Sequence, residues 1–407
     1  MLGTVRVTVP ESRRMVALYV AAGASFAALS ARGLTVPLYA HDLGASRFEV
    51  GALFSVSTLA AAVLSLPSGI LVDRFGARAL LGVSFLLAAA SQLATAATPS
   101  VAPLFIWQVV GGLASGAQQA ALFSAVTEST SGGRLGRALG WLTFSMQAGF
   151  FLGPSIAGVA LRFIDVRTDI AVTTTLLLAA IPGAMVASGT RQHIGQGFLL
   201  RAPLQALFRQ RLFVPVTIGL AAMTLGWGTI GAFLPVFGKE GLGLPSEQVG
   251  YLLAIQAVVN GFSRLPGGRL VDRSRHRWPI VFVGAIVWSA AVVVLGHLTG
   301  FVGPAIVLVV ATPFMATAFV AIGVVFADLS ATSTRGVTMG VYGTILFLGL
   351  AMGPLAFGPL VQGFGYTVGF TACAVVSVLL ALVMAAFHAE PLRRRGEAPL
   401  PPPAPGT

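Results

Sequence analysis

Long apolar runs, separated by short polar segments, recur twelve times along the chain. They fall at roughly 15–39, 48–71, 79–98, 102–126, 138–162, 170–189, 213–237, 248–270, 279–298, 302–326, 337–363 and 366–388. A helix that crosses the hydrocarbon core of a bilayer needs about 20 mostly apolar residues. The pattern therefore predicts an all-α integral membrane protein with 12 transmembrane helices.

Composition excludes the other broad classes. Of the 407 residues, 56% are hydrophobic and only 9% are charged, whereas an ordinary soluble domain carries roughly a quarter charged residues. Too few polar side chains exist to coat a water-soluble globule, and the apolar content is far too high for a disordered chain.

The polar segments divide the chain into two bundles. The longest connector, 191–212, separates the sixth apolar run from the seventh and is predicted to be a cytoplasmic linker. It joins an N-terminal six-helix bundle (15–190) to a C-terminal six-helix bundle (213–389). Residues 1–14 form a cytoplasmic tail, and 390–407, which are rich in Pro, are expected to be a disordered cytoplasmic tail.

Basic residues set the orientation. The formal net charge is +12, and twenty of the 25 Lys and Arg lie in the two tails and the even-numbered turns. Cytoplasmic loops collect Lys and Arg, so both termini are expected to face the cytoplasm. This distribution accounts for the positive charge without a nucleic-acid partner. The short loops favour the plasma membrane of a bacterium.

An internal repeat relates the two bundles. Residues 44–51 recur at 243–250, 66–74 at 265–273, and the glycines of 140–158 at 340–358, always with an offset of 199 or 200 residues. So constant an offset across five predicted spans indicates a parallel repeat of six helices. The predicted architecture is two pseudo-symmetric six-helix bundles related by an axis along the membrane normal.

Two motifs resemble those of a known family. Residues 69–78, GILVDRFGAR, resemble the loop 2–3 signature of the major facilitator superfamily (MFS), and 149–158, GFFLGPSIAG, are similar to its antiporter signature. The second motif is typical of the 12-span drug:proton antiporter branch. The resemblance implies the MFS fold, a monomer, and secondary active transport by alternating access.

By the same resemblance, charged residues at the cytoplasmic surface form a latch between the halves. Asp73 is expected to face the start of the eleventh span, near 336–340, where the helix dipole favours a carboxylate. The remaining latch residues are Arg74, Arg78 and Glu128 in the first half and Asp272, Arg273 and Asp328 in the second. The alternative is that they are loop charges that only set topology.

Small residues and prolines predict a pivot in spans 5 and 11. Gly149 and Gly153 allow another helix to approach the backbone closely, and Pro154 removes a backbone donor and bends its helix. Gly353 and Pro354 repeat the pattern. Tight packing without a mechanical role is the alternative.

Polar residues within apolar runs are the candidates for substrate binding. Arg32 lies deep in the first span, where an ionised group costs at least about 2.5 kcal/mol. It either binds an anionic or hydrogen-bond-accepting substrate, or snorkels to the surface or pairs with Asp42. The other candidates are Ser25, Gln108, Ser115, Gln119, Gln147, Trp227, Gln256 and Asn260. Buried amides more often hold membrane helices together.

Acidic residues are placed unusually for an antiporter. All 13 lie in tails, loops or span ends, so the proton-coupling candidates are Asp42, Glu49, Glu128 and Asp328. A strongly cationic substrate is disfavoured, because Arg32 would repel it.

No catalytic pair, phosphate loop or metal-ligand cluster stands in the sequence, so neither enzyme activity nor a cofactor or metal is expected. The prediction is a proton-coupled exporter of small organic, drug-like compounds. The alternatives are an uptake permease or facilitator for an anionic or neutral metabolite, and a non-transporting membrane receptor or scaffold with the same fold.

Overall fold

The computed structural model describes residues 11–130, 135–187, 201–329 and 335–396. Within these ranges the chain consists of helices and the turns that join them, with no strand. The all-α prediction is therefore confirmed.

Six long helices form the N-terminal half. They are α1 (Glu11–Asp42), α2 (Arg47–Phe75), α3 (Ala77–Ala97), α4 (Val101–Glu128), α5 (Leu135–Ala160) and α6 (Val166–Val186). A short helix, α7 (Arg201–Phe208), lies in the predicted linker. The C-terminal half contains α8 (Phe213–Glu240), α9 (Ser246–Arg273), α10 (Trp278–Leu295), α11 (Val302–Asp328), α12 (Arg335–Phe364) and α13 (Tyr366–Gly396). The first helix begins before the predicted 15, and α13 continues past the predicted 389. Residues 397–407 of the predicted tail lie outside the described residues.

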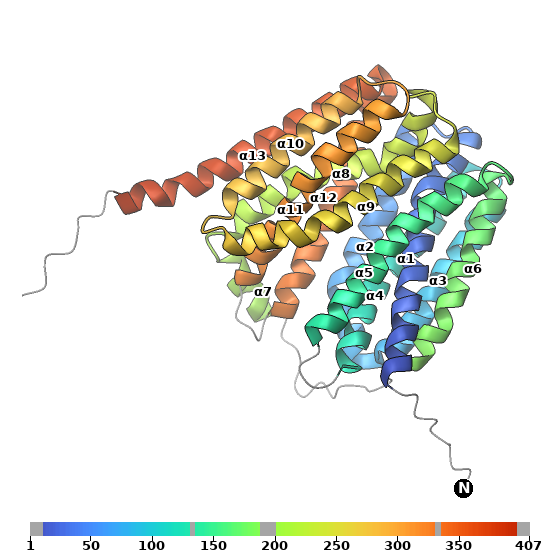
Figure 1. The fold of residues 1–407 in the computed structure, drawn as a ribbon, viewed down its shortest axis with the longest axis horizontal. Helices are drawn as coiled ribbons and strands as arrows, with labels where there is room; N and C mark the ends of the chain where they lie inside the picture. Colours follow the sequence, from blue (N-terminus) through green and yellow to red (C-terminus); the bar gives the residue numbers. More distant parts are fainter. Residues whose placement is uncertain (1–10, 131–134, 188–200, 330–334, 397–407) are drawn as a thin grey trace, which may run out of the picture.

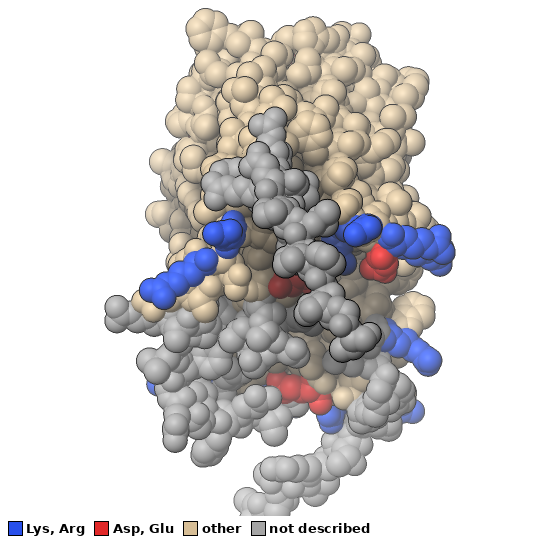
Figure 2. Space-filling view, turned by 90° about the vertical axis from the view of Figure 1, so that its left-hand side faces the viewer, with Lys and Arg blue, Asp and Glu red and all other residues tan. Residues whose placement is uncertain are grey.

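The two halves meet at one end and spread apart toward the other (Figure 1). We call the end with the α1–α2 and α8–α9 turns the outer end, following the orientation that the basic residues predict, and the opposite end the inner end. Viewed from the left of Figure 1, toward which the inner ends of the C-terminal helices point, the molecule carries more basic than acidic side chains (Figure 2).

Two long helix pairs form the interface between the halves: α2 packs along α12, and α5 packs along α9. The Ser55 hydroxyl donates to the carbonyl of Ala351 at 2.8 Å. Further toward the inner end, the hydroxyls of Ser65 and Thr344 lie 3.0 Å apart. Because the pairs cross between the bundles, these helices would carry any motion of one half against the other.

The turns at the outer end repeat the same backbone geometry. Gly44 and Gly243 have φ angles of 85° and 66°, a region that residues with a Cβ rarely adopt. These glycines belong to the repeated segments 44–51 and 243–250, so the pseudo-symmetry extends to backbone conformation.

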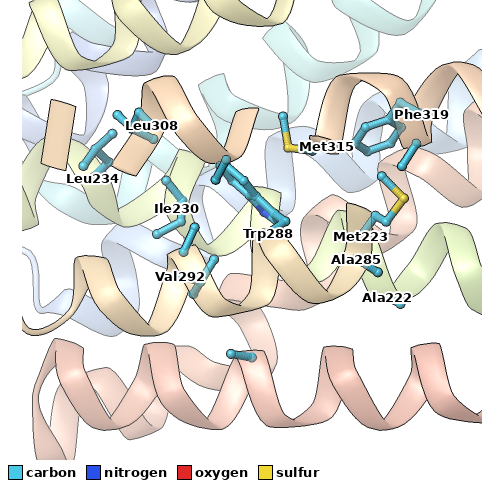
Figure 3. Packing of buried hydrophobic residues seen from close by; sticks show 14 of the residues in the cluster. Ala222, Met223, Ile230, Leu234, Ala285, Trp288, Val292, Leu308, Met315 and Phe319 are labelled. Atoms are coloured by element: carbon cyan, nitrogen blue, oxygen red, sulfur yellow. The ribbon is translucent and has the colours of Figure 1, made fainter. Parts of the chain in front are cut away.

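The C-terminal half has a dense apolar core around α8. Trp288 of α10 is 1% exposed and packs among apolar side chains of α8, α10 and α11, including Ile230, Val292 and Met315 (Figure 3). Between membrane helices such packing stabilises the fold through van der Waals contact, since lipid is as apolar as the core.

Large apolar side chains are also exposed on the bundle surface, among them Val63, Phe144, Phe163 and Phe364, which suits contact with lipid. Eleven helical segments of the described residues are long and apolar enough to cross a membrane. The helix α9, which carries Glu247, Arg264, Arg269, Asp272 and Arg273, is not among them. It nevertheless packs against α5 and α11 as a full-length member of its bundle.

Candidate substrate site and outer gate

A network centred on Glu240 joins the halves at the outer end. The Glu240 carboxylate, at the end of α8, accepts hydrogen bonds from Arg47 Nε at 2.8 Å and from the Tyr366 hydroxyl at 2.9 Å. His41 Nδ1 lies 3.4 Å from its other oxygen. The Arg47 guanidinium also stands over the Tyr366 ring, 4.8 Å from its centroid. One carboxylate thus ties α1 and α2 of the first half to α8 and α13 of the second.

Two further ion pairs cross between the halves at this end. Arg162, just beyond α5, pairs with Glu247 in the first turn of α9. Lys239 Nζ lies 3.9 Å from Asp42. We call His41, Arg47, Arg162, Glu240 and Glu247 the outer gate.

The outer gate was not expected from the sequence, in which Arg47, Arg162 and Lys239 stand out only as the minority of basic residues on the less basic side. A signal was present. Glu240 and Glu247, which are acidic residues at the outer ends of spans in the second half, are opposite in charge to the basic residues at the outer ends of spans in the first half.

The glycines of the predicted pivot pack inside their own half. A Cβ on Gly153 would stand 2.8 Å from the Ala31 nitrogen of α1, and one on Gly149 would stand 2.8 Å from the Ala27 nitrogen. In the second half, a Cβ on Gly353 would stand 2.7 Å from Thr229 Oγ1 of α8. These glycines therefore bring α5 onto α1 and α12 onto α8 at backbone contact.

The adjacent prolines face the other half. The Pro154 carbonyl lies so close to Gly250 of α9 that a side chain there would collide with it, and Pro354 lies against Gly51 of α2. Each helix thus uses the glycines of the predicted pivot within its bundle and the adjacent proline across the interface. The pivot role itself stays a prediction.

Arg32 lies in a polar cluster formed by α1, α2 and α4. Its guanidinium donates to Gln108 Oε1 and lies 3.4 Å from Ser57 Oγ, and the residue is only 8% exposed. Both partners are neutral. Gly111 makes room for the guanidinium, since a Cβ there would stand 2.7 Å from Arg32 Cζ. Asp42, the other partner considered from the sequence, lies near Lys239 instead.

A polar strip on α9 lies in the other half. Arg264 Nε donates to Asn260 Oδ1 at 3.0 Å. Gln256 is buried one turn before Asn260. Gln147 of α5 approaches this strip from the first half, because a Cβ on Gly261 would stand 3.3 Å from its Nε2.

The remaining binding candidates are less concentrated. Ser25 and Ser115 donate to carbonyls of their own helices, Ala22 and Gly111. Gln119 is exposed. Trp227 is half-buried, with its ring edge-on to Phe319 at 5.1 Å between centroids. The structure thus groups Arg32 with Gln108, and Gln256 with Asn260, but gathers no single cluster of all the predicted residues.

Three of the predicted latch residues at the inner end have contacts within their own halves. Arg78 donates to the Met185 carbonyl of α6, and Asp328 pairs with Arg277 at 2.7 Å. Glu128 accepts from Ser124 Oγ at 2.7 Å. Arg74, Asp272 and Arg273 are exposed. The side chains of Asp73 and of 335–337 lie outside what the structure describes, so the latch stays a prediction.

Among the proton-coupling candidates, Glu49 has a clear structural role. Its carboxylate accepts from the Ser46 N–H at 2.8 Å, while Ser46 Oγ accepts from the Glu49 N–H at 3.2 Å. This capping box satisfies donors at the start of α2. Asp42, Glu128 and Asp328 have the partners given above.

Comparison with solved structures shows transporters of the same fold. The chain superimposes on a mutant form of the nucleoside transporter NupG with a TM-score of 0.79 at 13% identity, covering 92% of this chain and 99% of that one. A bacterial homologue of the human lysosomal transporter Spinster, in an inward-facing and unoccupied conformation, gives a TM-score of 0.75 at 14% identity over 97% and 99% of the two chains.

Relatives by sequence are transporters as well. The uncharacterized MFS-type transporter MJ1560 of Methanocaldococcus jannaschii is 22% identical over 355 residues, 85% of this chain and 90% of that protein. The quinolone resistance protein NorA of Staphylococcus aureus is 24% identical over 123 residues, 30% of this chain and 32% of NorA. The family model of the Major Facilitator Superfamily matches residues 18–322 and 216–406. Twelve-span periodicity, paired bundles and family match agree, and the chain belongs to the Major Facilitator Superfamily.

Proposed function

We propose that this transporter exports small organic compounds from the cell by alternating access, driven by protons that move inward. Its termini would face the cytoplasm of a bacterial plasma membrane, and it would act as a monomer. The observation that carries the proposal is the outer gate: Glu240 and Glu247 hold the halves together at the outer end, while the halves spread toward the inner end (Figure 1).

The cycle follows from this asymmetry. A solute enters from the inner end and binds between the Arg32 cluster of one half and the α9 strip of the other. Closure of the inner end then requires the halves to rock about the contacts of Pro154 and Pro354. The outer gate opens in the same movement, and the solute leaves. The inner latch residues would stabilise the second state, in which the inner end is closed.

Export is favoured over uptake by two similarities. The segment 149–158 resembles the antiporter signature, and a quinolone resistance protein matches 30% of the chain. The second candidate, an uptake permease or facilitator for an anionic or neutral metabolite, is favoured by one observation: Arg32 is buried with neutral partners.

Purified protein in liposomes with an imposed pH gradient tests the proposal. An internal pH dye is followed while matched anionic, neutral and cationic compounds are added. Compound-dependent proton flux is expected. Compound uptake without proton flux would favour the facilitator over the proton-driven exporter. The lack of both uptake and proton flux would favour a receptor or scaffold.

A further inference from the structure

We infer that the solute is an organic anion whose carboxylate or similar acidic group binds the Arg32 guanidinium. The inference rests on the proposed function, since it assigns the chemical class of solute that this transporter carries. Three features of the described residues support it: an uncompensated buried charge, an excess of buried donors, and a second cation in the opposite half.

The first feature is the environment of Arg32. The residue is 8% exposed, and its hydrogen-bond partners, Gln108 and Ser57, carry no charge. A buried cation is costly unless an anion pairs with it. Snorkelling does not relieve the cost here, because the guanidinium turns toward α4, against Gly111. A bound anion would supply the missing charge.

The second feature is the orientation of the neighbouring amide. A guanidinium only donates hydrogen bonds, so the oxygen of Gln108 must face Arg32 and the nitrogen must point away. That Nε2 is buried and has no hydrogen-bond partner among the described residues. Buried polar groups in native structures are nearly always paired. The cluster therefore lacks an acceptor.

The same deficit recurs in the opposite half. Gln256 is 8% exposed, and its Nε2 also lacks a partner within the described part of the chain. It is ten residues from the outer end of α9, as Arg32 is from that of α1, so both lie about 15 Å from the outer ends of their helices. Nearer the inner end of the same strip, Arg264 has a neutral partner, Asn260.

Together these groups select for a ligand. A guanidinium and the neighbouring amide N–H of Gln108 bind a carboxylate well, whereas the guanidinium repels an ammonium ion and gains less from a neutral amide. Trp227 of the C-terminal half is half-buried, with the buried Phe319 packed edge-on to it, so its ring would suit stacking by a planar apolar body. The class is thus an amphipathic organic anion.

The test uses three probes of one shape: 2-naphthoate, 2-naphthamide and 2-naphthylmethylamine. Binding to the purified full-length protein is measured by calorimetry, and transport by counterflow in liposomes. Four proteins are compared: wild type, Arg32→Gln, Arg32→Lys, and Arg167→Gln, which replaces an exposed arginine at the start of α6. Thermal unfolding checks that each variant is folded.

Naphthoate is expected to bind the wild type at least about tenfold more tightly than either other probe, because hydrogen bonds to charged groups are the stronger ones. Arg32→Gln should remove that preference, Arg32→Lys should keep part of it because the charge remains, and Arg167→Gln should leave it unchanged. If Arg32→Gln does not fold, the inference is still tested by the Arg32→Lys variant and by the order of affinities of the three probes for the wild type.

Equal binding of all three probes, preference for the amine, absence of naphthoate binding, or full preference in folded Arg32→Gln would overturn the inference. Arg32-dependent binding without counterflow would support the anion site and instead contradict the proposed transport.

Discussion

Arg47 Nε, in the first turn of α2, lies 2.8 Å from a carboxylate oxygen of Glu240, in the last turn of α8. These residues belong to different halves and are 193 positions apart in the chain. Their contact joins the two halves at the outer end. The same carboxylate also accepts a hydrogen bond from Tyr366. The contribution of these contacts to the free energy of unfolding can be measured.

Double-mutant cycles should show a larger coupling free energy for the Arg47–Glu240 pair than for the neighbouring Lys239–Asp42 pair. For Arg47→Gln and Glu240→Gln, we expect a coupling free energy of about 1 kcal/mol, the upper end for partly exposed pairs. For Lys239→Gln and Asp42→Asn, whose charges lie 3.9 Å apart, the coupling should be near zero. Thermal unfolding in one detergent measures both cycles. Equal coupling in both would show that the Glu240 network adds nothing.

Gly153→Ala should destabilise the protein by about 1–3 kcal/mol, because the added methyl group must push α5 away from α1. Gly140→Ala is the matched control on the same helix, with open space at its Cβ position. It should be neutral, or stabilising by up to about 1 kcal/mol through helix propensity. Unfolding temperatures of the two variants test this, and similar losses in both would mean that helix packing at Gly153 is not tight.

Glu49→Gln separates capping from proton coupling. Glutamine also completes a capping box, so stability should be retained, whereas Ser46→Ala should lose about 1 kcal/mol. If Glu49 only caps α2, compound-dependent proton flux persists in Glu49→Gln. Loss of that flux in a stable Glu49→Gln protein would assign Glu49 to proton coupling.

Asp73→Asn should abolish transport while leaving membrane insertion intact, because the latch stabilises the state that is closed at the inner end. Asp272→Asn, in the second copy of the motif, should have a weaker effect, since its loop lacks the glycine of the first copy. Counterflow and the yield of folded protein are measured for both. Undiminished transport in Asp73→Asn would leave the motif a topology signal only.

The fold was predictable because each membrane-spanning helix can be recognised from its own stretch of sequence. Each span needs its own apolar run, and the repeat from Gly44 to Gly243 shows that the second bundle copies the first. The Arg32–Gln108 pair was half predictable: both residues stand out as polar within apolar runs, but nothing in the spacing shows that they meet. The Arg47–Glu240 contact was not predictable from the sequence. It joins two separate bundles, so it depends on how the bundles tilt against each other, and that tilt differs from one conformation of a transporter to the next.

The central claim, alternating access, is tested most directly by two spin-label distances. One pair, Ser100→Cys with Thr299→Cys, spans the outer end between exposed positions of the two halves. The other, Thr127→Cys with Arg275→Cys, spans the inner end. Both are placed in a Cys373→Ala background, which removes the one native cysteine.

Pulsed electron–electron double resonance in lipid nanodiscs measures the distance within each pair, with and without the double substitution Glu240→Gln and Glu247→Gln. Opening of the outer gate should lengthen the outer distance and shorten the inner distance together, because rigid halves rock about a shared interface. An outer distance that lengthens while the inner distance stays constant would contradict alternating access.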